Sequence, residues 1–141
     1  MNNGVYNKKK ILFICKNNSI RSQIAEAIVN SLYDKTHMAF SGGTEVKSIH
    51  ENTIRVLKEI NIDISNKKSK NIEIFKKMKF NHVITVCEDD NCPFFPNANN
   101  HIHKKFKNPD NSLKPENLDS FREVRDEIKK WLAELVENEI I

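Results

Sequence analysis

The chain alternates between two hydrophobic patterns. Short apolar runs rich in β-branched residues, such as those at 11–14 and 82–87, have the length of buried strands. Other segments repeat apolar residues every three or four positions, which is the period of an amphipathic helix. The predicted strands are 11–14, 38–41, 82–87 and a short one near 101–106, and the predicted helices are 22–32, one from about 51, a short one at 72–78, and 116–137.

This alternation predicts an α/β fold of three layers, α/β/α, in which helices cover both faces of a central four-stranded parallel sheet. Ligands of such sheets bind beyond the carboxyl ends of the strands. Cys15 and Cys87 each end a predicted strand, so we expect them to face one cleft. No repeat or linker divides the 141 residues, so we predict a single domain over 1–141, with a flexible N-terminus at 1–9.

The most informative segment is the loop after the first predicted strand, which contains Cys15, five further residues, Arg21 and Ser22. Backbone N–H groups of a tight loop and of a helix N-terminus bind tetrahedral oxyanions, and the same field favours the nucleophilic thiolate of a cysteine. Arg21 offers a fork of donors to two anion oxygens, and Ser22 is placed to hydrogen-bond the sulfur. Asn17 and Asn18 tolerate the left-handed backbone that an anion-binding loop needs. The predicted oxyanion-binding residues are Lys16, Asn17, Asn18, Ser19, Ile20, Arg21 and Ser22.

A simpler interpretation of this loop is a buried structural cysteine beside a surface arginine. The strand before the loop and the amphipathic helix after it favour the functional interpretation, because an anion-binding loop requires that context.

A second group of residues, Cys87 and Cys92, follows the third predicted strand. Cysteines five apart in an unbroken helix are too distant for a disulfide, so a redox pair requires an irregular segment. The acidic and amide residues between them and Pro93 favour such a segment. Two unrelated buried cysteines are the alternative. A zinc site that adds His101 and His103 is disfavoured, since the spacing is not Cys-x2-Cys. The other histidines, His37, His50 and His82, are predicted to be ordinary core or surface residues.

Composition narrows the function classes. Hydrophobic residues make up 38% and charged residues 30% of the chain, which is typical of a soluble globular protein. The net charge is +4, and the lysines alternate with acidic residues and have no aromatic residues between them, so we expect no nucleic-acid partner. The polar N-terminus and the absence of a long apolar run predict no signal peptide and no membrane partner. Three cysteines in such a chain indicate a reducing compartment, and we expect a cytoplasmic monomer without a cofactor or metal.

Taken together, these motifs resemble the thioredoxin-coupled arsenate reductases, which share the low-molecular-weight tyrosine phosphatase fold. The resemblance runs from Ile11 to about Leu135 and rests on CKNNSIRSQIAEA, SGGTE, IDIS, VITVCEDDNCPFFP and FREVRDEI. Gln23 after Arg21 and Ser22 is similar to the reductases, where the phosphatases usually have proline, and the cysteine pair is also a reductase feature.

The resemblance implies a three-cysteine relay. Cys15 attacks arsenate held by the loop and Arg21, and Cys87 then attacks the Cys15 sulfur, which releases arsenite. Cys92 next attacks Cys87, and thioredoxin reduces the resulting disulfide.

The sequence also departs from this family. The family has an aspartate before a proline in the loop after the fourth strand, where it protonates the leaving group. Here Asn108 takes that position, and an amide cannot donate an acidic proton. Asp110 is therefore a candidate substitute. A phosphotyrosine phosphatase that uses Cys15 and Arg21 alone, and a catalytically weak oxyanion-binding protein, stay open as alternatives.

Overall fold

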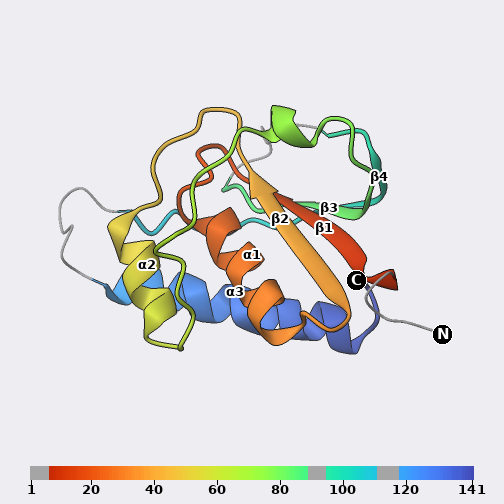
Figure 1. The fold of residues 1–141 in the computed structure, drawn as a ribbon. Helices are drawn as coiled ribbons and strands as arrows, with labels where there is room; N and C mark the ends of the chain where they lie inside the picture. Colours follow the sequence, from red (N-terminus) through yellow and green to blue (C-terminus); the bar gives the residue numbers. More distant parts are fainter. Residues whose placement is uncertain (1–6, 89–94, 111–117) are drawn as a thin grey trace.

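The computed structural model describes residues 7–88, 95–110 and 118–141. The strands and helices follow one another in the order that the hydrophobic pattern predicts (Figure 1). The elements are β1 (Lys9–Ile14), α1 (Arg21–Leu32), β2 (His37–Gly42), α2 (Glu51–Lys58), the 3₁₀ helix η2 (Ile72–Phe75), β3 (Phe80–Thr85), β4 (Ala98–His103) and α3 (Asp119–Glu137).

The four strands form one parallel sheet in the order β2-β1-β3-β4. In the central strand, Ile14 pairs with Gly42 of β2 and with Thr85 of β3. The carboxyl ends of β1 and β3 are therefore next to each other, as expected. The predicted four-stranded parallel sheet is confirmed.

The two faces of the sheet are covered unequally. Ile11 and Phe13 of β1 point to a core shared with α1, α2 and α3, whereas Leu12 and Ile14 point to a second core built around η2. Figure 1 shows the three α-helices below the sheet and η2 above it. The alternation of side chains along a strand produces this division, because successive residues face opposite sides. Both faces are covered, with a much thinner helical layer on the side of η2.

A carboxylate between two arginines joins α2 to α3. Glu59, directly after α2, lies 2.7 Å from Nη2 of Arg122 and 2.7 Å from Nη1 of Arg125. Hydrogen bonds from Arg122 and Arg125 lower the pKa of the Glu59 carboxyl from 4.5 to about 2. This contact holds α2, and with it the loop before α2, against the closing helix.

Several predicted boundaries are wrong. β4 spans Ala98–His103, whereas the prediction placed this strand near 101–106. It is an edge strand that contains the polar residues Asn99 and Asn100, so its start has no apolar run by which it could be recognised. The third strand ends at Thr85, so Cys87 lies just beyond it.

Two further boundaries differ at the predicted ends. The short helix predicted at 72–78 is a single 3₁₀ segment over Ile72–Phe75. β1 begins at Lys9, the last residue of the predicted flexible N-terminus at 1–9, and residues 1–6 of that segment lie outside the described part.

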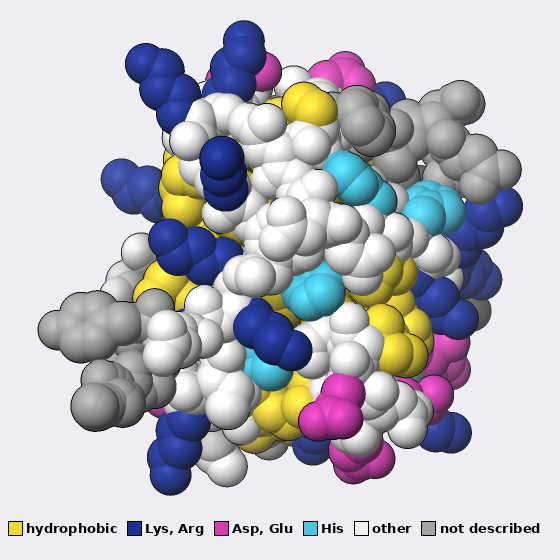
Figure 2. Space-filling view, turned by 90° about the vertical axis from the view of Figure 1, so that its right-hand side faces the viewer, with side chains coloured by type: hydrophobic (Ala, Val, Ile, Leu, Met, Phe, Trp, Pro, Cys, Tyr) yellow, Lys and Arg dark blue, Asp and Glu magenta, His cyan; other side chains and the backbone are white. Residues whose placement is uncertain are grey.

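Figure 2 shows the face on the right-hand side of Figure 1. Its lysine and arginine side chains are spread over several places, with acidic side chains and histidines among them. Within the described part of the chain, no helix is long and apolar enough to cross a bilayer.

Candidate active site

The loop between β1 and α1 forms one wall of a small pocket. Cys15, Asn17, Ser19, Ile20 and Arg21 line the pocket, together with Asn108 from the segment after β4. Among the residues that the structure describes, no side chain caps the start of α1, whose N-cap position is Ile20. The first N–H groups of a helix need acceptors, and an oxyanion in the pocket would supply them. The pocket is therefore suited to a tetrahedral anion beside the sulfur of Cys15.

Cys15 is a free thiol and only 2% exposed. Its sulfur lies 2.9 Å from the hydroxyl oxygen of Ser22, which confirms the predicted contact. Asn18 Nδ2 donates to the same oxygen over 2.9 Å. Because the Ser22 oxygen already accepts from Asn18, its own proton is available to the sulfur. A hydrogen bond of this direction stabilises negative charge that develops on the sulfur.

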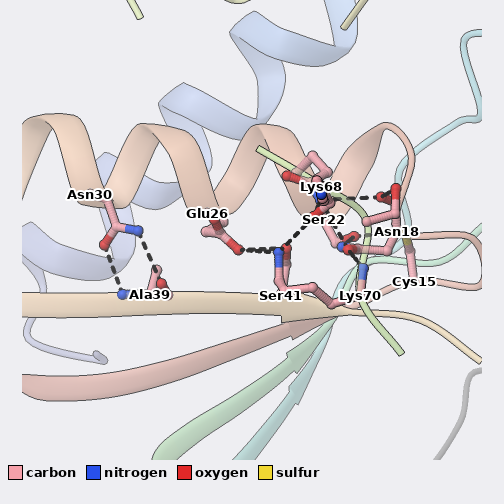
Figure 3. A network of polar contacts seen from close by, with 11 residues as sticks. Cys15, Asn18, Ser22, Glu26, Asn30, Ala39, Ser41, Lys68 and Lys70 are labelled. Carbon is pink, nitrogen blue, oxygen red and sulfur yellow. Dashed lines mark hydrogen bonds and ion pairs between the residues drawn. The ribbon is translucent and has the colours of Figure 1, made fainter. Parts of the chain in front are cut away.

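Asn18 has a left-handed backbone with φ 51, as the sequence predicts, and is fully buried. Its Oδ1 accepts from Nε2 of Gln23 over 2.9 Å and from the backbone N–H of Lys70 over 2.8 Å. Its carbonyl oxygen accepts from the Ser69 hydroxyl over 2.9 Å. Figure 3 shows these contacts meeting at the start of α1. Both ends of the Asn18 amide are fixed, and so is its donation to Ser22.

The loop also requires a glycine on the neighbouring strand end. A Cβ atom at Gly43 would lie 2.5 Å from the carbonyl oxygen of Lys16 and 2.8 Å from that of Cys15. Any larger residue would push the loop away from β2. Gly43 therefore allows the close approach of two backbones, which is a role of glycine in anion-binding loops.

Three loop side chains bind the neighbouring segment 45–48. Lys16 forms an exposed ion pair with Glu45 at 3.2 Å, and Asn17 Nδ2 donates to the Glu45 carbonyl oxygen over 2.6 Å. The Ser19 hydroxyl donates to the Ser48 carbonyl oxygen over 2.8 Å. These contacts attach the loop to residues 45–48.

Arg21 supplies the cationic wall of the pocket. Its Nη1 donates to the Phe106 carbonyl oxygen over 3.0 Å, which fixes the guanidinium under the segment after β4. Its Nε is buried and has no hydrogen-bond partner within the described part of the chain. A buried guanidinium donor of this kind requires an acceptor, and an anion oxygen fits that requirement.

Cys87 lies beside the nucleophile loop. The Cys87 sulfur is 3.9 Å from the carbonyl oxygen of Ile14, the residue directly before Cys15, and the N–H of Val86 donates to the same oxygen over 2.9 Å. Cys87 is 6% exposed and is disulfide-bonded. The predicted placement of Cys15 and Cys87 at one edge of the sheet is thus confirmed, while Cys92 lies outside the described residues.

The residue that reaches the pocket from the far side is Asn108 and not Asp110. The N–H of Asp110 donates to Asn108 Oδ1 over 3.1 Å, and the Asp110 carboxylate lies 3.5 Å from Nε2 of His50. His50 accepts from the N–H of Asn52 through Nδ1 and so caps α2. The backbone N–H of His50 also donates to the Ser19 carbonyl oxygen over 3.2 Å.

His50, predicted to be an ordinary residue, thus connects Ser19 of the loop to Asp110 of the segment after β4. Its position before a helix was the available signal, because residues at an N-cap accept from the backbone.

The chain was compared with known protein families and matches one of them. The family model described as low molecular weight phosphotyrosine protein phosphatase matches residues 10–140. The chain belongs to this family. The resemblance read from the sequence motifs is confirmed.

The relatives point to a branch of the family. An arsenate reductase of Brevibacillus brevis is 36% identical over 133 residues, covering 93% of this chain and 96% of that protein. Arsenate reductase 1 of Staphylococcus haemolyticus is 37% identical over 132 residues, covering 92% and 96%. Among solved structures, an arsenate reductase in the phosphate-binding state has a TM-score of 0.80 at 30% identity, covering 92% of this chain and 98% of that one. A thioredoxin-dependent arsenate reductase of Corynebacterium glutamicum has a TM-score of 0.70 at 25% identity, covering 93% and 61%.

Proposed function

We propose that this protein reduces arsenate to arsenite through a thiol–disulfide relay. The observation that carries the proposal is the position of Cys87, whose sulfur lies 3.9 Å from the backbone oxygen next to Cys15. A second cysteine at this place has no use in ester hydrolysis but is required in a relay. The arsenate reductases among the relatives and structural neighbours support the same assignment.

The first step uses the residues of the anion loop. The Cys15 thiolate attacks the arsenic atom of arsenate, forms a sulfur–arsenic bond and displaces one oxygen, which leaves as water after protonation. Backbone N–H groups of the loop and Arg21 hold the remaining oxygens and stabilise their charge. Ser22 stabilises the attacking thiolate from 2.9 Å.

The second step transfers two electrons to arsenic. The Cys87 thiolate attacks the Cys15 sulfur, a sulfur–sulfur bond forms, and the pair of the breaking sulfur–arsenic bond passes to arsenic, which leaves as arsenite. Cys92 then attacks Cys87 and releases the Cys15 thiolate. Thioredoxin, as a dithiol, reduces the 87–92 disulfide and is itself oxidised. A disulfide-bonded Cys87 and a free Cys15 are the states expected after the attack by Cys92.

Protonation of the leaving oxygen is assigned to Asp110. Asn108 lines the pocket but carries no acidic proton. Asp110 is bound to Asn108 through its backbone and to His50 through its carboxylate. Because this carboxyl lies outside the pocket lining, we expect slower turnover than an aspartate at position 108 would give.

The test is a thioredoxin-coupled arsenate assay on the parent and on Cys15→Ser, Cys87→Ser and Cys92→Ser. We expect sustained turnover to stop in all three. Cys92→Ser should complete one turnover and accumulate a disulfide between Cys15 and Cys87, which peptide mass spectrometry detects. Undiminished arsenate reduction by Cys87→Ser would contradict the relay.

A phosphatase is the second candidate, supported by the description of the matching family. It would use Cys15 and Arg21 alone, so Cys87→Ser would hydrolyse aryl phosphates as well as the parent does. If arsenate produces no disulfide and no ester is hydrolysed, the protein is an oxyanion-binding protein.

A further inference from the structure

We propose that Lys70 is a positioning residue for Cys15, acting through its ammonium group on Glu26 and through its backbone on Asn18. The inference rests on the proposed role of Cys15 as the nucleophile. Lys70 touches neither the sulfur nor the anion pocket, and nothing in the motif around Cys15 points to it.

The first contact of Lys70 is with a buried carboxylate. Glu26 of α1 has a side chain that is 8% exposed and lies 3.5 Å from Nζ of Lys70. The Ser41 hydroxyl donates to the same carboxylate oxygen over 2.6 Å, and Nζ of Lys70 also donates to the Lys68 carbonyl oxygen over 3.1 Å. Figure 3 shows Glu26 turned from α1 toward Ser41 and Lys70. A buried carboxylate is costly unless it is paired and hydrogen-bonded, and Lys70 supplies the charge.

The second contact of Lys70 begins a chain of donors that ends at the sulfur. The Lys70 N–H donates to Asn18 Oδ1, Asn18 Nδ2 donates to the Ser22 oxygen, and Ser22 lies 2.9 Å from Cys15. Each step fixes the direction of the next, because the amide of Asn18 cannot turn over without losing its bonds to Lys70 and Gln23. Lys70 therefore anchors this chain of donors together with Gln23.

The contacts of Lys70 with Glu26 and with Asn18 both affect the surroundings of the Cys15 sulfur. Glu26 follows Ser22 by one turn of α1, so the two side chains lie on one face of the helix. If the ammonium is removed, an unpaired negative charge remains one turn from the thiolate and from the bound anion. We expect this charge to disfavour the thiolate and to weaken oxyanion binding. Asp63 and Lys67 also line the cavity beside Glu26, and the exposed Lys67 offers a control from the same loop.

The experiment uses full-length protein with Cys87→Ser and Cys92→Ser, so that Cys15 is the one thiol. Ultraviolet absorbance of the thiolate and the rate of alkylation by iodoacetamide are followed against pH. Lys70→Met is expected to move the thiolate midpoint up by about one pH unit and to reduce alkylation at neutral pH by about tenfold. Phosphate binding should weaken by a similar factor.

Three further variants separate charge from structure. Lys70→Arg should behave like the parent, and Lys67→Met should too, although it loses the same charge. Glu26→Gln combined with Lys70→Met should bring the midpoint back to within about 0.3 pH units of the parent, because no unpaired charge remains. Circular dichroism checks that each variant is folded.

An unchanged midpoint in folded Lys70→Met would overturn the inference, as would a double variant that stays shifted. The titration needs no arsenate, so it is independent of the reductase assay. A shift in Lys70→Met without arsenate turnover in the parent would uphold the role of Lys70 and reject the proposed reaction.

Discussion

The two walls of the pocket are built in different ways. On the nucleophile side, Asn18, Ser22 and Gln23 are at most 1% exposed and bind one another through hydrogen bonds. On the opposite side, Asn108 is exposed and the Asp110 side chain is 48% exposed. The proposed nucleophile is thus fixed by a buried polar network, whereas the proposed proton donor lies on a surface segment. Changes to the first wall should cost both activity and stability, and changes to the second wall should alter activity alone.

The surface segment is nevertheless anchored. Phe106 is 5% exposed and packs against Trp131, with 5.4 Å between the two ring centroids. The Ser120 hydroxyl donates to the Pro109 carbonyl oxygen over 3.0 Å. Apolar packing of Phe106 and the hydrogen bond to the Pro109 carbonyl oxygen therefore hold the segment in place. The polar side chains of Asn108 and Asp110 are exposed and take no part in this packing. This wall can change its chemistry without disturbing the core.

The largest effect is expected at the nucleophile itself. Cys15→Ser should abolish arsenite formation, because a serine oxygen cannot form a disulfide with Cys87 and the two electrons then cannot pass to arsenic. Phosphate binding should stay within about threefold of the parent, since the loop N–H groups and Arg21 remain. Arsenite production and phosphate titration measure the two properties. Loss of phosphate binding would show that the sulfur, and not the loop, holds the anion.

A large effect is also expected at the centre of the buried network. Asn18→Ala removes three side-chain hydrogen bonds, those with Ser22, Gln23 and the Lys70 N–H, and strains a backbone with φ 51, so it should cost about 3 kcal/mol of unfolding free energy and most of the activity. Asn61→Ala is the matched control, because Asn61 has φ 65 but is exposed.

For Asn61→Ala we expect a loss of about 1 kcal/mol and unchanged activity. Denaturant unfolding and initial rates test both variants. Equal losses in the two would assign the effect at Asn18 to backbone strain alone.

A moderate effect is expected on the exposed wall, with opposite signs at two positions. Asn108→Asp should raise turnover about tenfold by placing an acid in the pocket, and Asp110→Asn should lower it about threefold. Neither should change the unfolding free energy by more than about 0.5 kcal/mol, because both sites are exposed. Steady-state rates against pH test this prediction. An Asp110→Asn variant as fast as the parent would remove Asp110 from the mechanism.

The smallest effect is expected away from both walls, at Glu59. Since its pKa is about 2 in the folded protein and 4.5 ordinarily, its ionised form stabilises the fold above pH 4.5, and this contribution is lost as the pH falls toward 2. The side chain is 35% exposed, so Glu59→Gln should cost only about 1 kcal/mol at pH 7.

The difference between Glu59→Gln and the parent should shrink toward zero near pH 2. Urea unfolding across this range measures it, with Glu127→Gln on the exposed side of α3 as a control. A difference that does not depend on pH would mean that the arginine contacts are not electrostatic in origin.

The sequence by itself determined the fold class and the nucleophile wall. The strand, loop and helix that position Cys15, Arg21 and Ser22 are contiguous, so the apolar run, the spacing and the left-handed asparagine could be recognised without long-range contacts. The even spacing of apolar residues also placed the helices to within a few residues. β4 was placed three residues too late, because an edge strand has no continuous apolar run.

The tertiary structure alone decided which distant residues serve the pocket. Gly43 and His50 come after β2, and Lys70 lies between α2 and η2. Each contacts the loop at the edge of the sheet where the carboxyl ends of the parallel strands β1 and β2 lie side by side. No local pattern distinguishes Lys70 from the other lysines near it. Its pairing with Glu26 exists only after α1 has packed on β2, and a contact created by packing cannot be seen in the order of residues.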